Sequence, residues 1–160
     1  MSALLDYLVR KKDDRGVMAE LRCALVDSKR HRAYPYLGWC GGIGQGHSAR
    51  VKQTVAGLYA SHPEMTSNGN TGSLCREMCR PDEDLEKGPM AKRLQYLLAA
   101  GRDEILDRVI RIVLRAKAEG IQVNYTALED DLNYWGDEVK NKWAATFWTP
   151  SAEADHAIPD

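Results

Sequence analysis

Apolar residues recur every three or four positions along almost the whole chain, and no segment shows the alternation of apolar and polar residues that is typical of a strand. This spacing places apolar side chains on one face of a helix. The longest such segment runs from residue 103 to about residue 119, and its apolar residues are Ile105, Leu106, Val109, Ile112 and Val113. The sequence therefore predicts an all-α fold, a single-domain helical bundle of about seven or eight helices with long loops.

Residues that favour helix termini predict where these helices begin and end. Asp14 is a predicted N-cap, because its carboxylate can accept a hydrogen bond from a free backbone N–H group in the first turn. Ser48 is expected to cap another helix, Pro89 suits the first turn of a third, and Gly120 favours the end of the longest one. The expected helices cover residues 2–12, 15–27, 49–61, 74–80, 89–100, 103–119, 124–135 (from Asn124 or Thr126) and 137–148, and the main expected loops are 33–46, with a short helical turn near Tyr36 to Trp39, and 62–73.

The chain has 160 residues, a length that suits one domain with one core. We expect a helical domain over residues 1–148, followed by a flexible polar tail over residues 149–160. Trp135, Trp143 and Phe147 are expected to be buried between the helices at the end of that domain.

The sequence contains no feature that would send the chain to a membrane or out of the cell. No apolar run approaches the ~20 residues that a membrane span requires, and the N-terminal segment lacks the pattern of a signal peptide. We therefore expect a cytoplasmic protein with no membrane partner. In a reducing compartment Cys23, Cys40, Cys75 and Cys79 are expected to be free thiols.

Charge is distributed unevenly along the chain, although the net charge is only −1. Residues 1–60 hold ten Lys and Arg against five Asp and Glu, residues 61–120 hold ten against ten, and residues 121–160 hold two against eight. A polarised chain of this kind can bind an anion on one face and stay in solution through the other.

Motifs for catalysis, nucleotide binding or metal binding are absent or incomplete. The glycine-rich segment 42–46 follows no predicted strand and lacks the Gly-Lys-Ser/Thr ending of a phosphate loop. Cys75 and Cys79 lack the spacing of a zinc knuckle and are expected to be buried thiols. The consecutive acids of residues 129–131 are expected to form a solvated helix face. We therefore expect no enzyme, no metal, no cofactor and no small-molecule substrate.

Arginines on the longest predicted helix are the most informative polar residues. Arg108, Arg111 and Arg115 share one face at spacings of three and four residues. Glu104 and Asp107 precede the first two of them by four residues, so the arginines could simply form ion pairs within the helix. Alternatively, they could join basic residues of other helices, such as Lys92 and Arg93, along a phosphate chain.

Segments spread along nearly the whole chain resemble CasB, the family of the small subunit of the type I-E CRISPR surveillance complex called Cascade. The similar segments are Asp14-Arg15-Gly16-x-x-Ala19-x-Leu21-Arg22, Lys92-Arg93-Leu94-x-x-Leu97-Leu98, and Ile121-x-Val123-Asn124-Tyr125-x-x-Leu128-x-x-Asp131-Leu132-x-x-Trp135, followed by Trp143-Ala144-x-x-Phe147. Each segment is mainly a packing pattern, and it is their shared order and spacing that identify the chain as similar to this family.

The resemblance implies a non-catalytic, all-helical subunit that contacts CRISPR RNA (crRNA) and target DNA backbone and holds the displaced DNA strand of the R-loop. Its implied partners are the other Cascade subunits and a second copy of itself. The implied nucleic-acid-binding residues are Arg22, Arg93 and Arg111, expected on one continuous surface, and further Arg15, Arg50, Arg102 and Arg108. The alternative is a protein-interaction scaffold whose arginines pair only with Asp and Glu and contact no nucleic acid.

Overall fold

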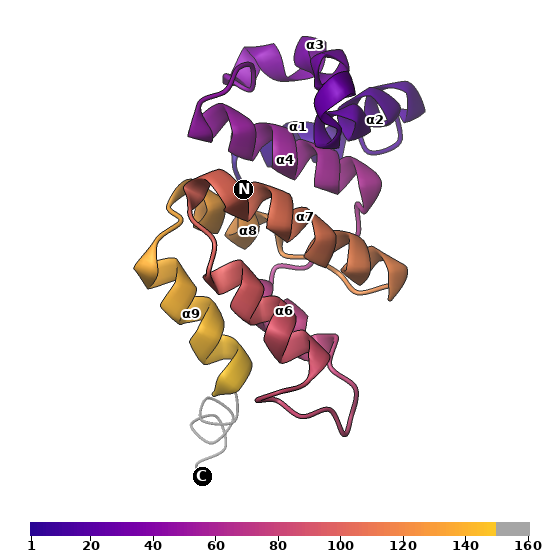
Figure 1. Ribbon diagram of the computed structural model, residues 1–160. Coiled ribbons are helices and arrows are strands. Elements are labelled where there is room, and N and C mark those ends of the chain that lie inside the picture. The colour runs from indigo at the N-terminus through magenta and orange to yellow at the C-terminus, as the bar shows by residue number, and fades with distance from the viewer. Residues whose placement is uncertain (150–160) are drawn as a thin grey trace.

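The computed structural model describes residues 1–149 and confirms the all-α, single-domain bundle (Figure 1). Within these residues the chain forms nine α-helices and three short 3₁₀ helices, more than the seven or eight helices expected. The helices are α1 (Ala3–Arg10), α2 (Arg15–Arg22), η1 (Cys23–Leu25), η2 (Asp27–Ala33), α3 (Tyr34–Leu37), η3 (Gly38–Cys40), α4 (His47–Ser61), α5 (Thr71–Glu77), α6 (Pro89–Leu98), α7 (Arg102–Ala118), α8 (Tyr125–Asn133) and α9 (Asp137–Trp148).

Helix α4 lies at the centre of the fold and packs against α1, α2, α7 and α8. In Figure 1 α2 and α3 lie above α4 and α1 lies behind it, while α6 and α9 lie below α7 at the other end of the molecule. Ten of the fifteen residues of α4 are buried, including Val51, Val55, Leu58 and Tyr59. A single connected core runs from Leu4 to Phe147, so the two ends of the described chain share one core.

Most of the predicted helix ends are confirmed. The Asp14 side chain accepts a hydrogen bond from the Val17 backbone N–H at 3.1 Å, and Asn124 caps α8 in the same way. Pro89 is the first residue of α6. Gly120 follows α7 with a φ of 70°, a left-handed conformation that glycine adopts without steric cost.

Other helix boundaries differ from the sequence prediction. Helix α4 begins at His47 after Gly46, and Ser48, the expected cap, accepts a hydrogen bond from Lys52 instead. Residues 34–40 form helical turns, so the expected loop over 33–46 shrinks to its glycine-rich half. The helix expected over 15–27 ends at residue 22, and short 3₁₀ helices follow it.

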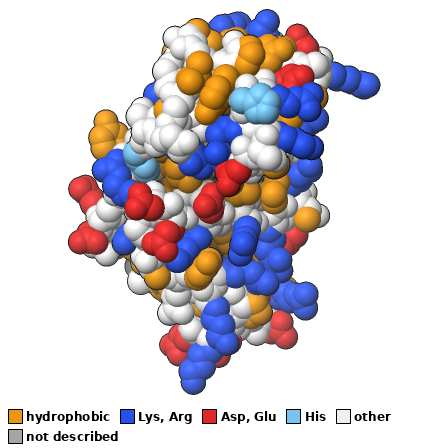
Figure 2. All heavy atoms as spheres, turned by 45° about the horizontal axis from the view of Figure 1, so that its top comes forward, with side chains coloured by type: hydrophobic (Ala, Val, Ile, Leu, Met, Phe, Trp, Pro, Cys, Tyr) orange, Lys and Arg blue, Asp and Glu red, His pale blue; other side chains and the backbone are white. Residues whose placement is uncertain are grey.

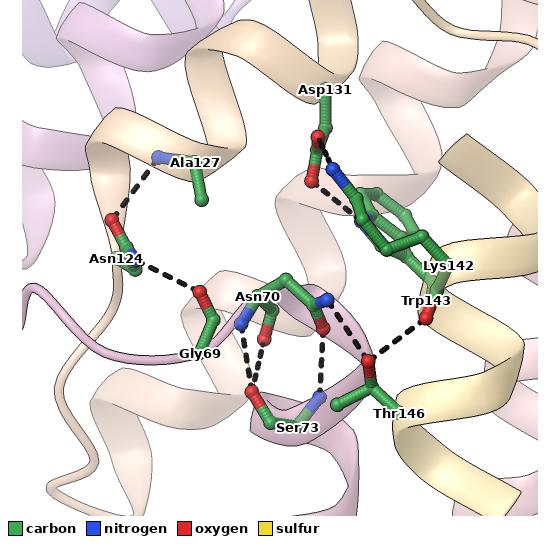
Figure 3. A network of polar contacts seen from close by, with 9 residues as sticks. All are labelled: Gly69, Asn70, Ser73, Asn124, Ala127, Asp131, Lys142, Trp143 and Thr146. Atoms are coloured by element: carbon green, nitrogen blue, oxygen red, sulfur yellow. Dashed lines mark hydrogen bonds and ion pairs between the residues drawn. The ribbon is translucent and has the colours of Figure 1, made fainter. Parts of the chain in front are cut away.

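Helix α5 begins earlier than expected because Asn70 caps it. The Asn70 and Ser73 side chains bond to each other's backbone N–H groups, an arrangement that satisfies two otherwise unpaired donors (Figure 3). The Asn70 amide also donates to Thr146 of α9 at 3.1 Å, and Asn124 at the start of α8 donates to the Gly69 carbonyl at 2.8 Å. This network fixes the start of α5 against α8 and α9.

Helices α5 and α9 come so close together that one glycine is required between them. The backbone of Gly72 lies directly against the backbone of Trp143, where an added Cβ would overlap the Trp143 carbonyl oxygen. As predicted, Trp135, Trp143 and Phe147 are buried, and the rings of the two tryptophans lie 4.8 Å apart. The expected tail over 149–160 falls, apart from its first residue, outside the described residues.

Candidate nucleic-acid interface

A groove of about 340 Å³ lies between α6 and α7 and is bordered by positively charged side chains. Figure 2 shows Lys and Arg side chains gathered down the right side and lower centre of the face it presents, with a group of Asp and Glu side chains at the left edge. No acidic residue lines the groove. Its lining residues are Lys92, Arg93, Tyr96, Leu97, Arg108, Arg111, Ile112 and Arg115.

The amphipathic pattern of the two helices explains why these charges meet. In α6 the buried residues are Met90, Ala91, Leu94 and Leu97, so the positions of Lys92, Arg93 and Tyr96 fall on the outer face. In α7 the buried residues are Ile105, Leu106, Val109, Ile112, Val113 and Ala116, so the arginine stripe faces outward as well. Packing the two apolar faces together therefore leaves the two polar faces side by side.

The start of α6 is held in place by an acidic side chain. Glu83 accepts hydrogen bonds from the backbone N–H groups of Met90 at 2.8 Å and Arg80 at 3.1 Å. These bonds, which favour the charged form, lower the pKa of the Glu83 carboxyl. The carboxylate therefore stabilises the first turn of α6, which carries Lys92 and Arg93 into the groove.

Arg108 is engaged within the protein. Its guanidinium donates to the Tyr96 carbonyl at 2.6 Å and to the Glu104 carboxylate at 3.0 Å, and it lies 3.9 Å from the centre of the Tyr96 ring. One of the two ion pairs expected within α7 is therefore present. It fixes Arg108 at the back of the groove and leaves this arginine little freedom to bind a ligand.

Arg111 differs from Arg108 in its contacts, although each arginine has an acidic residue four positions before it in the sequence. Asp107 makes no ion pair with Arg111, and the exposed Arg111 guanidinium has no hydrogen-bond or ion-pair partner among residues 1–149. Arg93 is half-buried, and within residues 1–149 its guanidinium forms no ion pair and one hydrogen bond, to the Met90 sulfur at 3.6 Å. These two arginines from different helices are therefore available to bind an anion in the same groove.

Two further predicted site residues, Arg50 and Arg102, meet in a second depression, of about 600 Å³. Asp103 and Asp107 line it too, so its charges are balanced. Arg102 donates to the Asn133 carbonyl at 3.0 Å, and the buried Nε of Arg50 finds no partner within the described residues. This depression lacks the excess of positive charge that distinguishes the α6–α7 groove.

The remaining two predicted residues, Arg15 and Arg22, lie on α2 and line neither depression. Arg22 donates through Nε to the Ala60 carbonyl at 3.0 Å, and this bond ties α2 to the end of α4. Arg15 is exposed. The structure thus brings Arg93, Arg108 and Arg111 together and holds Arg22 elsewhere.

The sequence prediction did not include Tyr96 among the site residues. Tyr96 follows Lys92 by four residues and Arg93 by three, so its place on the same helix face could have been read from the spacing. An exposed tyrosine on a helix is ordinary, however, and only the tertiary contact with Arg108 distinguishes it.

Of the acids of residues 129–131 only Asp130 is exposed, so the solvated face that was expected does not form. Glu129 and Asp131 are both buried. Glu129 accepts a hydrogen bond from the Ser2 hydroxyl, and Asp131 accepts one from Trp143 Nε1 at 2.8 Å and contacts Lys142 at 2.7 Å (Figure 3). Glu129 therefore connects α8 to the N-terminal segment, and Asp131 connects α8 to α9.

Two histidines and the four cysteines also have contacts that indicate a role in the fold and not in chemistry. His47 and His62 donate from Nε2 to the carbonyls of Leu132 and Ile121, at 2.7 and 2.6 Å. The four cysteines are free, and burial raises the pKa of the Cys75 thiol to about 12. Among the described residues no group of three His, Cys, Asp or Glu is placed to hold a metal ion, and none of the described helices is long and apolar enough to cross a membrane.

Comparison with known proteins gives both a family and a fold. Residues 17–148 match the family described as CRISPR-associated protein Cse2. The fold is similar to that of CasB from Thermus thermophilus, with a TM-score of 0.74 at 23% identity over 92% of this chain and 99% of that one. It is also similar to CasB from M. ruber, with a TM-score of 0.72 at 20% identity over 98% of this chain and 96% of that one. No curated protein sequence matches the chain.

Proposed function

The chain belongs to the Cse2 family of CRISPR-associated proteins, and from this premise we propose that it is a non-catalytic subunit of Cascade, the type I-E RNA-guided surveillance complex. In this proposal it binds nucleic-acid backbone and stabilises the R-loop between crRNA and target DNA, including the displaced DNA strand, in antiviral defence. Its partners are the other Cascade subunits and a second copy of itself, and it works in the cytoplasm without a cofactor.

The observation that carries the proposal is the α6–α7 groove. Five of its eight lining residues are cationic, and Arg93 and Arg111 have no acidic partner among residues 1–149. An arginine guanidinium can bind a phosphate group through two hydrogen bonds, and charge from two helices can follow a chain of phosphates. The groove therefore suits an extended polyanion better than a compact ligand.

Contacts to the nucleic-acid backbone are also the kind that stabilising an R-loop requires. In an RNA-guided complex the sequence is read by base pairing, so a protein subunit needs only to hold the strands. Exchanging a DNA duplex for an RNA–DNA duplex is nearly balanced in free energy. A few phosphate contacts to the displaced strand are then sufficient to favour the open R-loop.

A salt titration tests the proposal. Binding of the protein to single-stranded DNA should weaken with salt by about 0.7 log units of affinity per log unit of salt for each phosphate neutralised. Arg111→Ala should weaken binding to all sequences alike and flatten this slope by about that amount. The double variant Arg93→Ala/Arg111→Ala should bind more weakly still and destabilise the R-loop while leaving guide loading unchanged.

Arg32→Ala is the matched control. It removes the same charge from the chain, but Arg32 is paired with Glu20 at 2.8 Å and lies outside the groove. Its affinity and salt slope should equal those of the unmodified protein. If the double variant also assembles and binds target DNA with unaltered affinity and slope, the groove arginines do not contact nucleic acid, and the chain is a protein-interaction scaffold.

A further inference from the structure

The α6–α7 groove is more than a row of charges, because its floor is apolar. Leu97 and Ile112 line it from the two helices and are both almost fully buried. Tyr96 stands beside them with 51% of its surface exposed. A site that binds phosphate alone gains nothing from apolar walls. The volume of about 340 Å³ lies at the lower end of the ~300–1,000 Å³ that is typical of small-ligand sites, and it exceeds the space that one phosphate group fills.

The Tyr96 ring is held in a fixed orientation by Arg108. The guanidinium of Arg108 lies over one face of the ring, 3.9 Å from its centre, and is itself held by the Tyr96 carbonyl and by Glu104. Arg108 occupies one face of the ring, so the opposite face is the one on which a ligand could stack, and 51% of the surface of Tyr96 is exposed. Tyr96 therefore presents a rigid aromatic surface next to unpaired arginines.

From this arrangement we propose that Tyr96 is a base-stacking residue. An unstacked nucleobase lies on the open face of the Tyr96 ring, and the phosphates on either side of it bind Arg93 and Arg111. This inference rests on the function proposed above and adds to it that the groove holds a base as well as the backbone.

The positive charge of the groove favours a nucleotide over neutral or cationic ligands that also contain a flat ring. Every charged side chain that lines the groove is positive, so the occupant must be anionic. A nucleotide in a single strand combines an anionic backbone with a flat ring, and stacking on an aromatic side chain is tolerant of base identity. A duplex keeps its bases paired and stacked inside, so the groove should favour single strands over duplex DNA.

Removing the bases from the strand tests the proposal directly. The probes are a labelled oligothymidine and a strand of equal length built of abasic deoxyribose phosphates, which carries the same charge. The protein should bind the oligothymidine more tightly, and Tyr96→Ala should lower that affinity by about fivefold to 150-fold. The same variant should bind the abasic strand as the unmodified protein does.

Conservative variants separate stacking from packing. Tyr96→Phe keeps the ring and should bind oligothymidine normally, whereas Tyr96→Leu keeps apolar bulk without the ring and should behave like Tyr96→Ala. Tyr134→Ala is the matched control, because Tyr134 is 77% exposed and lies outside the groove. Thermal unfolding of each variant shows whether the fold is preserved. If Tyr96→Ala does not fold, the comparison of Tyr96→Phe with Tyr96→Leu tests the same proposal.

The outcomes also separate this inference from the proposed function. If the protein binds both strands equally and Tyr96→Ala changes neither affinity, the base-stacking role is wrong while backbone binding stands. If neither strand binds, the proposed function itself fails, and the base-stacking role fails with it. If Tyr96→Ala and Tyr96→Leu impair assembly with protein subunits but leave oligothymidine binding intact, the groove takes a protein side chain and the inference is overturned.

Discussion

Replacing Gly72 with alanine should destabilise the protein, although alanine is the better helix former. Gly72 is the second residue of α5, and an added methyl carbon would overlap the Trp143 carbonyl oxygen and lie 2.9 Å from its carbonyl carbon. Ordinary van der Waals contact begins at about 3.4 Å. Both neighbours are backbone atoms, so no side chain can rotate away, and α5 must move from α9.

The magnitude follows from two opposing effects. Alanine favours a helix over glycine by about 1 kcal/mol at most. Overfilling a packed interface, with the backbone shifts that it forces, typically costs about 1–3 kcal/mol and occasionally more, and the overlap with backbone atoms places Gly72→Ala in the upper part of that range. The movement also strains the Asn70–Thr146 hydrogen bond, which joins the same two helices. We expect a net loss of about 1–3 kcal/mol and, for a chain of this length, a melting temperature lower by about 2–12 °C.

Gly16→Ala is the matched control, because Gly16 is the second residue of α2. Its added methyl would meet only the Asp14 carboxylate at 3.6 Å, an ordinary contact. This variant should be as stable as the unmodified protein or gain up to about 1 kcal/mol. Urea unfolding followed by circular dichroism measures both. A Gly72→Ala variant as stable as Gly16→Ala would refute the close approach of α5 and α9.

Two further predictions concern the core. Trp143→Ala should lower the free energy of unfolding by about 3–5 kcal/mol, since it empties a fully buried site and leaves Asp131 without its indole donor; an unchanged urea midpoint would contradict this. Cys75 should resist iodoacetamide near pH 8 in the folded protein and react in urea, because it is fully buried and its pKa is raised to about 12. Mass spectrometry can compare it with half-buried Cys23, and equal labelling of the two in the folded state would show that α5 opens.

Local chemistry explains which parts of the fold could be predicted from the sequence. Asp14, Pro89 and Gly120 act within one turn of their own helix, so their effect does not depend on distant residues. The helical turns over 23–40 lack a regular apolar stripe and were missed over residues 28–35. The start of α5 is set by the Asn70–Ser73 capping box, which is local and was overlooked, whereas the contact of Asn70 with Thr146 of α9 is one that no short segment reveals.

The candidate site depended still more on tertiary contacts. The spacing of Arg108 and Arg111 predicted a shared helix face, and both line the same groove. The same spacing gave each an acidic neighbour, yet only the Glu104–Arg108 pair forms. Arg108 is held by Glu104 and by Tyr96 of the neighbouring helix, whereas Arg111 has no ion-pair partner within residues 1–149. The equal spacing of the two arginines on α7 thus did not reveal which of them would be available to a ligand.

The central place of α4 has a consequence for the protein while it is being made. The ribosome synthesises its partners α1 and α2 before α4, but it synthesises α7 and α8 afterwards. Helix α8 begins at residue 125, which is 64 residues after α4 ends at residue 61. At ~5–20 residues per second, the side of α4 that later packs on α8 has no cover for roughly 3–13 seconds. During that interval the nascent chain exposes an apolar helix face, and a holding chaperone at the tunnel exit would find its best target there.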